Sequence, residues 1–343
     1  AADSTIDDNA SLSVGTLELA NFALTLDDNM SRLSVAQPVT LDAAGEQIVT
    51  GAADLSLNGG ISVTAGTLSS TGGTLSLPSG GTLASGASFS TSNTTLNLGG
   101  ILAVADAWTI TSTSISLTDN ASLSSTVPLS LASLQTNGHD FDLASATSDL
   151  TIENAFALSG SETLSTQGAD LIFESSADIS SGSRLDASGG GKLEFQQGGT
   201  ASGTINARNA IFRILAAYAV PGTLKTNSST TWYLGSSNLN LSGGKLELGG
   251  TVTLDNVLTD DQTTFKLGED ATVTRNQGFT LGDLDLDNST FTLGSATTDL
   301  TIGIGGSSPG PPTVSSVAIT SATGIQNNLL NVGDMVSVTA TFS

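Results

Sequence analysis

Three aspartates alternate with other residues at positions 283, 285 and 287. On an extended strand alternate side chains project from one face, so Asp283, Asp285 and Asp287 would present their carboxylates together. Oxygen-rich groups of this kind suit Ca²⁺. The spacing matches the opening of an EF-hand loop, although Asn288 stands where that loop has glycine and Gly294 where it has a bidentate glutamate. We interpret the three aspartates as candidate calcium ligands, with an acidic, solvated strand face as the alternative.

Residues for nucleophilic or acid–base chemistry are scarce. The chain has no cysteine and one histidine, His139, in the turn-like segment 137–140. The Gly-x-Ser-x-Gly pattern at 306–310 lies in a proline-rich stretch with no helical pattern after it, so it is not a nucleophile elbow. We predict that the chain is not an enzyme and, calcium apart, needs no cofactor.

A group of mixed charge offers the main alternative to that prediction. Eight of the nine basic residues lie between 184 and 275. An enzyme acting on acidic polysaccharides would need carboxylates beside Arg or Lys on one face, and alternate residues of a strand share a face. The candidates for such a site, or for a plain ladder of solvated charges, are Asp170, Glu174, Asp178, Arg184, Asp186, Lys192 and Glu194.

Aromatic side chains are the remaining candidates for ligand contact. They make up only 4% of the chain. Trp108 and the pair Trp232 and Tyr233 could stack on carbohydrate, or they could close the core of the fold.

The overall charge limits the partners. With a formal net charge of −23, the chain would be repelled by phosphate backbones, and we expect no nucleic-acid partner. Residues 55–105 carry no charge, but they contain too much Ser, Thr and Gly for a membrane span, and we expect none. The lack of cysteine is compatible with a bacterial surface protein.

The elements that would position these residues are short strands. Ser, Thr and Gly fill 135 of the 343 positions, while hydrophobic residues still make up 38%. A Gly-Gly pair followed by alternating apolar and small polar residues recurs, which predicts a turn and then a strand. It stands at 59–64, 72–77, 80–83, 99–104, 190–195, 243–248 and 249–254.

A longer repeat and one ambiguous segment complete the pattern. Residues 143–152 match residues 293–302, which indicates either a duplicated block or repeated use of one strand–turn–strand unit. The dense apolar run at 207–220 fits either a short helix or a buried strand.

We predict an all-β fold: a parallel β-helix (β-solenoid) over residues 1–302, followed by a short two-stranded β segment of sandwich (Ig-like) type. At roughly 20 to 25 residues per coil, the solenoid would have about 12 to 15 coils. Residues 303–312 contain three prolines and would form a Gly/Ser/Pro linker. Residues 313–343 are too few to hold a core, so they would be an incomplete Ig-like strand pair or strands donated to a neighbour.

The Gly-Gly-x-Leu-x-Leu units and the 143–152 unit resemble repeats of bacterial surface proteins of the filamentous-haemagglutinin and autotransporter-adhesin type. The tail 314–339 resembles the opening strands of the immunoglobulin-like extender modules of such proteins. This resemblance implies a right-handed parallel β-helix and a role in adhesion or in a cell-surface fibre.

From these patterns we predict an extracellular or cell-surface protein that acts as an elongated structural or adhesive rod. Its partners would be neighbouring copies of itself, further modules of the same chain, or cell-surface glycans. Two alternatives remain open: a filament subunit joined through its C-terminal strands, and a polysaccharide-active β-helix enzyme or carbohydrate-binding module.

Overall fold

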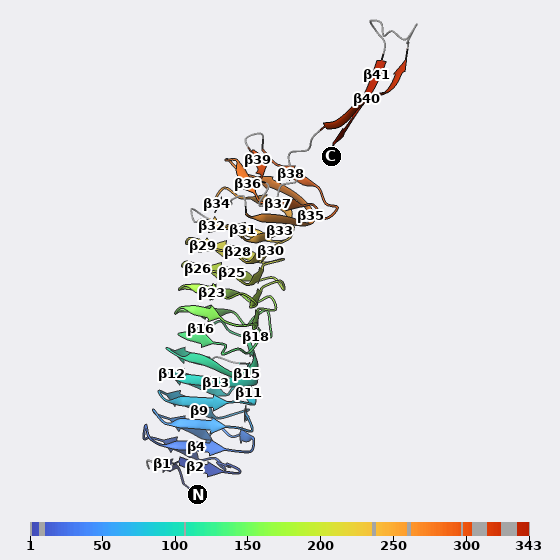
Figure 1. Ribbon diagram of the computed structural model, residues 1–343. Coiled ribbons are helices and arrows are strands. Elements are labelled where there is room, and N and C mark those ends of the chain that lie inside the picture. Colours follow the sequence, from blue (N-terminus) through green and yellow to red (C-terminus); the bar gives the residue numbers. More distant parts are fainter. Residues whose placement is uncertain are drawn as a thin grey trace. The chain divides into compact units, whose positions relative to one another are not determined.

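A computed structural model describes residues 2–6, 11–105, 108–234, 238–258, 262–295, 298–303, 314–323 and 335–342. The chain divides into two compact units, residues 1–303 and 304–343. The described residues form strands and turns, with no helix among them. The first unit is a parallel β-solenoid of about 14 turns, which confirms the predicted fold class and falls within the predicted range of coils (Figure 1).

Successive coils stack strand on strand, and every pairing in the first unit is parallel among the described strands. One six-stranded sheet contains β1 (Ser4–Ile6), β3 (Ala23–Leu26), β6 (Gln47–Thr50), β9 (Thr67–Thr71), β12 (Ser88–Ser92) and β14 (Trp108–Thr111). Another contains β16 (Leu129–Leu131), β19 (Leu150–Ile152), β22 (Leu171–Phe173), β25 (Lys192–Phe195), β28 (Ile211–Ile214) and β31 (Thr231–Tyr233).

The largest sheet covers two faces of the solenoid because its longest strands bend from one face to the next. Its strands are β2 (Ser11–Val14), β4 (Arg32–Val35), β5 (Val39–Leu41), β7 (Asp54–Leu57), β8 (Ile61–Val63), β10 (Thr74–Leu77), β11 (Gly80–Leu83), β13 (Thr95–Val104), β15 (Ser114–Ser125), β17 (Ser133–Gln135), β18 (Phe141–Leu143), β21 (Thr163–Ser165), β24 (Arg184–Asp186), β27 (Thr204–Asn206), β30 (Thr223–Lys225), β33 (Lys245–Thr253), β35 (Thr264–Thr274), β37 (Asp283–Asp285) and β38 (Phe291–Leu293).

Shorter sheets pair β20 (Phe156–Leu158) with β23 (Ala177–Ile179), β36 (Phe279–Leu281) with β39 (Leu300–Ile302), and join β26 (Gly199–Thr200), β29 (Tyr218–Ala219), β32 (Leu239–Asn240) and β34 (Val257–Leu258). They continue the face on which β17 lies, because β17 is followed by β20 and β23 by β26.

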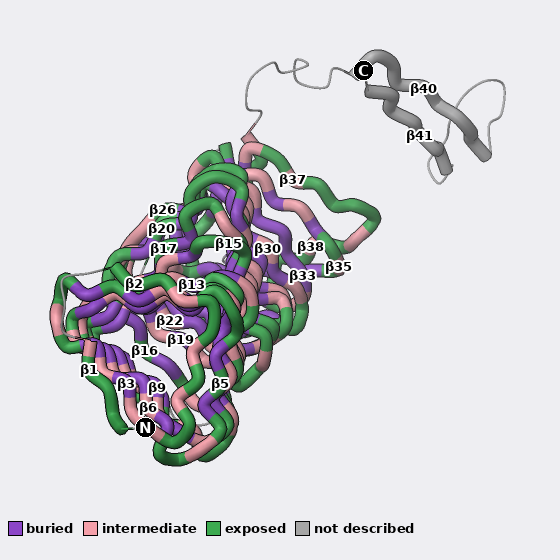
Figure 2. The backbone as a smooth tube through the Cα atoms, turned by 90° about the horizontal axis from the view of Figure 1, so that it is seen from below, coloured by how far each residue is buried: buried purple, intermediate pink, exposed green. Residues whose placement is uncertain are grey.

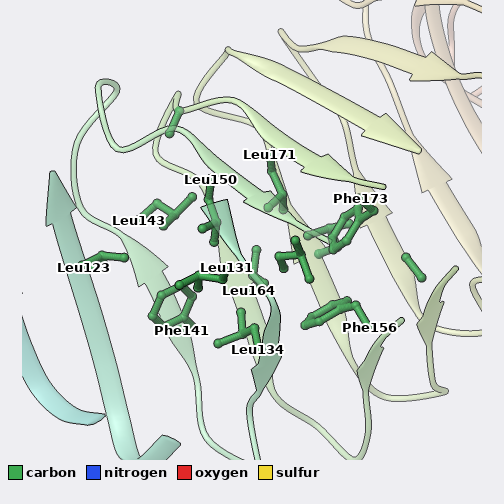
Figure 3. Packing of buried hydrophobic residues seen from close by; sticks show 14 of the residues in the cluster. Leu123, Leu131, Leu134, Phe141, Leu143, Leu150, Phe156, Leu164, Leu171 and Phe173 are labelled. Carbon is green, nitrogen blue, oxygen red and sulfur yellow. The ribbon is translucent and has the colours of Figure 1, made fainter. Parts of the chain in front are cut away.

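Alternation along each strand builds the core. Along most strands buried residues alternate with intermediate or exposed ones (Figure 2), as expected when successive side chains point to opposite faces. Equivalent apolar residues of successive coils lie in register, so they form buried columns (Figure 3). One such column is Leu33, Leu55, Leu75, Leu96, Ile115 and Leu134.

Aromatic rings stack along the interior in the same way. The ring centroids of Phe156 and Phe173 lie 5.0 Å apart, and those of Phe173 and Phe195 lie 5.3 Å apart. Phe212 lies edge-on to Phe195 at 6.1 Å, and the segment 207–220 contains the two strands β28 and β29. The buried-strand interpretation of that segment is therefore correct and the helix is not formed.

The Gly-Gly pairs mark corners where one coil's backbone touches the next. At Gly80 φ is +71°, and a Cβ atom there would lie 1.9 Å from the carbonyl oxygen of Ile101. No other residue fits that corner without displacing the adjacent coil.

Strand boundaries resolve the origin of the long repeat. The strands β13, β15, β16, β17, β18 and β19 recur 150 residues later as β33, β35, β36, β37, β38 and β39. Both long pairings shift register at a Gly-Gly pair, between Leu98 and Gly100 and again between Leu248 and Gly250. The side chain of Ser148 bonds to the Ser125 amide, as Thr298 does to Arg275. These matches favour a duplicated multi-coil block.

The second copy of the block is rotated by one face of the solenoid. The strands β18, β21, β24, β27 and β30 form one column, which begins with the second halves of β13 and β15. The first half of β33 continues this column. In the first copy, the equivalent half of β13 lies on the neighbouring column with β10 and β17.

The second unit contains an antiparallel pair, β40 (Val314–Thr323) and β41 (Met335–Phe342). The two predicted strands are present. The predicted linker 303–312 lies outside the described residues except for Gly303.

Candidate functional site

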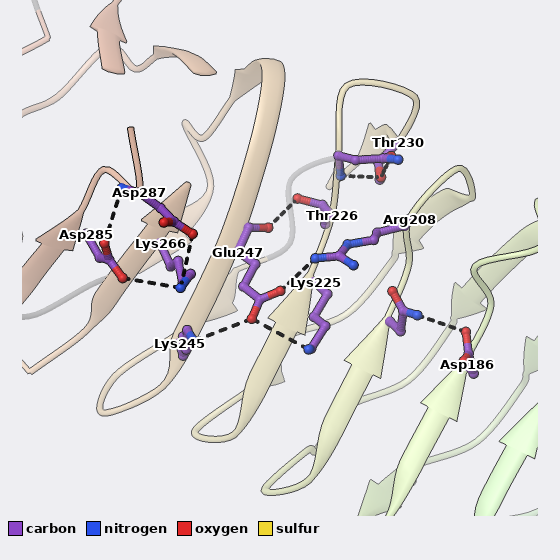
Figure 4. A network of polar contacts seen from close by, with 12 residues as sticks. Asp186, Arg208, Lys225, Thr226, Thr230, Lys245, Glu247, Lys266, Asp285 and Asp287 are labelled. Carbon is purple, nitrogen blue, oxygen red and sulfur yellow. Dashed lines mark hydrogen bonds and ion pairs between the residues drawn. The ribbon is translucent and has the colours of Figure 1, made fainter. Parts of the chain in front are cut away.

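The three candidate calcium ligands lie on and just after β37, but they do not form one group. The Nζ atom of Lys266 lies 3.4 Å from a carboxylate oxygen of Asp285 and 3.4 Å from one of Asp287 (Figure 4). Asp283 instead accepts a hydrogen bond from the amide of Leu284, at 2.9 Å. Within the described ranges no three Asp, Glu or His side chains converge as a metal site would require. Calcium binding stays a prediction.

Lys266 supplies the positive charge between these carboxylates. The hydrogen bond to Asp287 and the charges of Asp287 and Asp285 raise the pKa of Lys266, so its ammonium stays charged at neutral pH. In the first copy of the block, the same positions carry neutral groups, where Asn137 donates to Ser116 at 2.9 Å. The ion pair thus replaces a hydrogen bond that joins neighbouring coils.

Three cations surround the carboxylate of Glu247 on the same face of the solenoid. Its carboxylate lies 2.8 Å from Arg208, 3.6 Å from Lys225 and 3.4 Å from Lys245 (Figure 4). The Glu247 side chain is only 12% exposed. Strand register places Lys225, Glu247, Lys266 and Asp285 one above another, so charges of opposite sign alternate from coil to coil. We call this column the charge ladder.

The mixed-charge group predicted from sequence is spread over different faces. Lys192 lies 3.8 Å from Asp170 and 3.5 Å from Glu194, and Arg213 lies 3.1 Å from Glu194, all on the β16–β31 sheet. Asp178 lies on β23, and Arg184 pairs with Asp186 on β24.

Hydrogen bonding explains why Asp186 stays ionised there. Burial opposes its charge, but hydrogen bonds from Ser188 and the Arg184 charge hold the pKa of Asp186 below its usual value. Arg184 and Asp186 lie on β24, in a different sheet from Lys192 and Glu194, so the predicted residues do not form one group. The Glu194 side chain is only 5% exposed, so this carboxylate is buried between its cations and not solvated.

Many other carboxylates bind the backbone of the next coil, a role that sequence reasoning missed. Asp54 accepts the amide of Thr74 at 2.9 Å, and Asp170 accepts the amide of Lys192 at 2.7 Å. The same contact is made by Asp140, Asp149, Asp178, Asp255 and Asp270, each to a residue about one coil further along. Each aspartate lies 20 to 23 residues before the amide that it binds, and this spacing of about one coil is the signal that would have found them.

Glu46 is a buried version of this contact. Its carboxylate accepts backbone amides of Asn21, Asp42 and Ala43, at 3.3, 2.7 and 3.3 Å. Burial opposes the charge, yet these backbone hydrogen bonds hold the pKa of Glu46 below its usual value. The residue joins the second and third coils.

His139 occupies the predicted turn. Its amide donates to the carbonyl of Thr136 at 2.9 Å, and the residue is half-buried. The Gly-x-Ser-x-Gly pattern at 306–310 lies outside the described residues. The absence of enzymatic activity stays a prediction.

The two tryptophans have different surroundings. Trp108 is 5% exposed, stacks on Phe89 at 4.7 Å and donates its indole N–H to Thr91 at 2.9 Å, so it closes the core. Trp232 is half-buried with its ring edge-on to Phe212 at 5.5 Å, and the adjacent Tyr233 is 54% exposed.

The coils between 55 and 105 present hydroxyl and amide groups outward. Ser56, Ser76 and Asn97 lie in register on one face, and Asn97 donates to Ser76 at 3.2 Å. A shallow groove of about 430 Å³ runs over these three residues, from Ser11 on β2 to Asn97 on β13.

None of the described residues lies in a helix that could cross a lipid bilayer. Comparison of the chain with protein-family models, with curated proteins and with solved structures finds no match. The fold and the site geometry therefore carry the functional argument alone.

Proposed function

We propose that this chain is an extracellular structural and adhesive protein whose solenoid acts as an elongated rod. The observation that carries the proposal is the unbroken parallel stacking of about 14 turns, with small polar groups outward and an apolar column inside. Such a stack spans distance with a repetitive surface and has no deep central cavity.

The distribution of charge supports a surface role. Acidic residues are tied to backbone amides of neighbouring coils or to the charge ladder, so they stabilise the stack. The coils at 55–105 carry no charge and offer little electrostatic resistance to contact with another surface.

A second candidate is the filament subunit. The pair β40 and β41 is the whole described sheet of the second unit, and two strands alone are marginally stable. Strands of a neighbouring copy, or further residues of an Ig-like module, would complete it by strand addition.

Beads coated with the purified chain test the proposal. We expect the beads to be retained under flow on cell layers, and negative-stain images of the free chain to show rods. Retention no higher than for albumin-coated beads would overturn the adhesive role, while end-to-end polymers in the images would favour the filament.

A further inference from the structure

Three exposed apolar side chains lie on or next to the neighbouring strands β28 and β31. Tyr233 on β31 is the one exposed aromatic among the side chains that the structure describes. Ile211 and Leu215, on and just after the neighbouring strand β28, are 41% and 43% exposed. The register pairs Arg213 of β28 with Tyr233, so these side chains share the outer face of one sheet. The fold does not need them there, because Phe212 and Ile214 supply the core contacts of β28.

A hollow of about 300 Å³ lies beside Tyr233. One side is formed by the end of β31 and the other by the end of β33 and the turn after it. The hollow is lined by Trp232, Tyr233, Leu234, Thr253, Asp255 and Asn256. Its volume is at the small end of the range for ligand sites, which fits one or two sugar rings better than a peptide.

The polar groups of the hollow are held in place. The Asp255 carboxylate accepts the backbone amide of Asn276 at 2.7 Å and the side-chain amide of Asn276 at 3.0 Å. An ionised carboxylate has about four acceptor positions, so both oxygens retain capacity for a ligand hydroxyl. Trp232 is fixed by its edge-on contact with Phe212, at 5.5 Å.

We propose that this hollow binds a neutral hexopyranose unit of a glycan. A pyranose has an apolar face, which suits the exposed Tyr233 ring, and a rim of hydroxyls, which suits Asp255, Asn256 and Thr253. Trp232 packs inward against Phe212 and forms part of the wall of the hollow. Arg213 is already paired with Glu194 at 3.1 Å, and Arg275, which interacts with the charge of Asp255, is buried against the Phe279 ring. Neither arginine lines the hollow, while Asp255 does and would repel a uronic or sialic carboxylate. The ligand is therefore uncharged. This inference rests on the proposed adhesive function and names its ligand class.

Tryptophan fluorescence provides a direct test because the chain has only two tryptophans. Trp108 is 5% exposed and is not among the residues that line the hollow, whereas Trp232 is. The full chain is titrated with the methyl glycosides of glucose, galactose, mannose and N-acetylglucosamine. At least one should change the emission, and Trp232→Phe should abolish the change.

Matched variants locate the site. Tyr233→Ala should weaken binding on the order of tenfold, and Tyr233→Phe should retain it, because stacking needs the ring and not the hydroxyl. Ile101→Ala removes an apolar side chain that is 64% exposed on distant coils and should leave binding unchanged. Circular dichroism verifies that each variant is folded.

Two results would overturn the inference: no response to any glycoside by fluorescence or saturation-transfer NMR, or equal affinity in wild type and Tyr233→Ala. If either result is accompanied by bead retention in wild type, the adhesive proposal stands and only this site is refuted. If wild-type beads are not retained but the wild-type chain binds the glycoside, the adhesive proposal is refuted and this site stands.

Discussion

Lys266 and Asp287 make an ion pair, with 3.4 Å between Nζ and a carboxylate oxygen, at the positions where Ser116 and Asn137 make a hydrogen bond 150 residues earlier. A duplicated block has thus kept a contact between neighbouring coils while its chemistry changed. The pairing also decides how the aspartates at 283, 285 and 287 can respond to a cation, because any Ca²⁺ has to displace the ammonium.

Calcium binding at these aspartates should therefore depend on Lys266. We expect Lys266→Gln to bind Ca²⁺ more tightly than wild type, since the replaced ammonium no longer competes for Asp285 and Asp287. Calorimetric titration and the shift of the thermal midpoint with added CaCl₂ measure this. Adding Asp285→Asn and Asp287→Asn should remove the response, and a response that survives would place calcium elsewhere.

Glu247 should matter far more than an exposed ion pair. Glu247→Gln leaves Arg208, Lys225 and Lys245 close together without their shared carboxylate, and we expect a loss of about 1 to 3 kcal/mol at low ionic strength. Arg32→Gln, which breaks an exposed pair with Asp54, should cost less than about 1 kcal/mol. Urea denaturation at low and high NaCl gives both values. Equal effects of the two variants would show that the charge ladder does not hold the coils.

Glu46 should make stability depend on pH. Its pKa is lower in the folded chain than in the unfolded chain, so its contribution is present above the unfolded value of about 4.3 and is lost as pH falls through the folded value. We expect Glu46→Gln to lower the thermal midpoint at pH 7 and to differ little from wild type near pH 3. A difference that stays constant over this range would mean that the charge of Glu46 has no role.

Gly80 should tolerate no side chain. Gly80→Ala places a methyl group where 1.9 Å separates it from the Ile101 carbonyl oxygen, at a φ of +71°, so β11 and β13 must separate. Hydrogen exchange should become faster in both strands. Gly15→Ala is the matched control because its Cβ meets no atom within 4 Å. Unchanged protection in Gly80→Ala would disprove the close contact.

Sequence patterns were sufficient for the architecture because alternation is local. The Gly-Gly pairs and the alternating leucines predicted the strands, and Phe212 and Ile214 lie inward as a strand requires. Which charges meet could not be predicted, since coil length varies. Ile115 lies 19 residues after its partner Leu96, whereas Leu164 lies 23 after Phe141.

The same uncertainty concealed the aromatic site. Trp232 and Tyr233 are adjacent, so one must point inward and the other outward, but only the register with Phe212 and Arg213 decides which. Two of the predicted calcium ligands, Asp285 and Asp287, both pair with Lys266, which the alternation of the aspartates could not indicate.

The rotation of the second copy of the block changes the face on which its strands lie. Because the second copy begins one strand further around the coil, the face that a segment occupies depends on how many strands precede it as well as on its own sequence. An inserted strand and turn upstream would move each downstream strand to the next face of the solenoid. Insertions in distant coils can therefore change the direction in which Tyr233 points relative to the N-terminal coils.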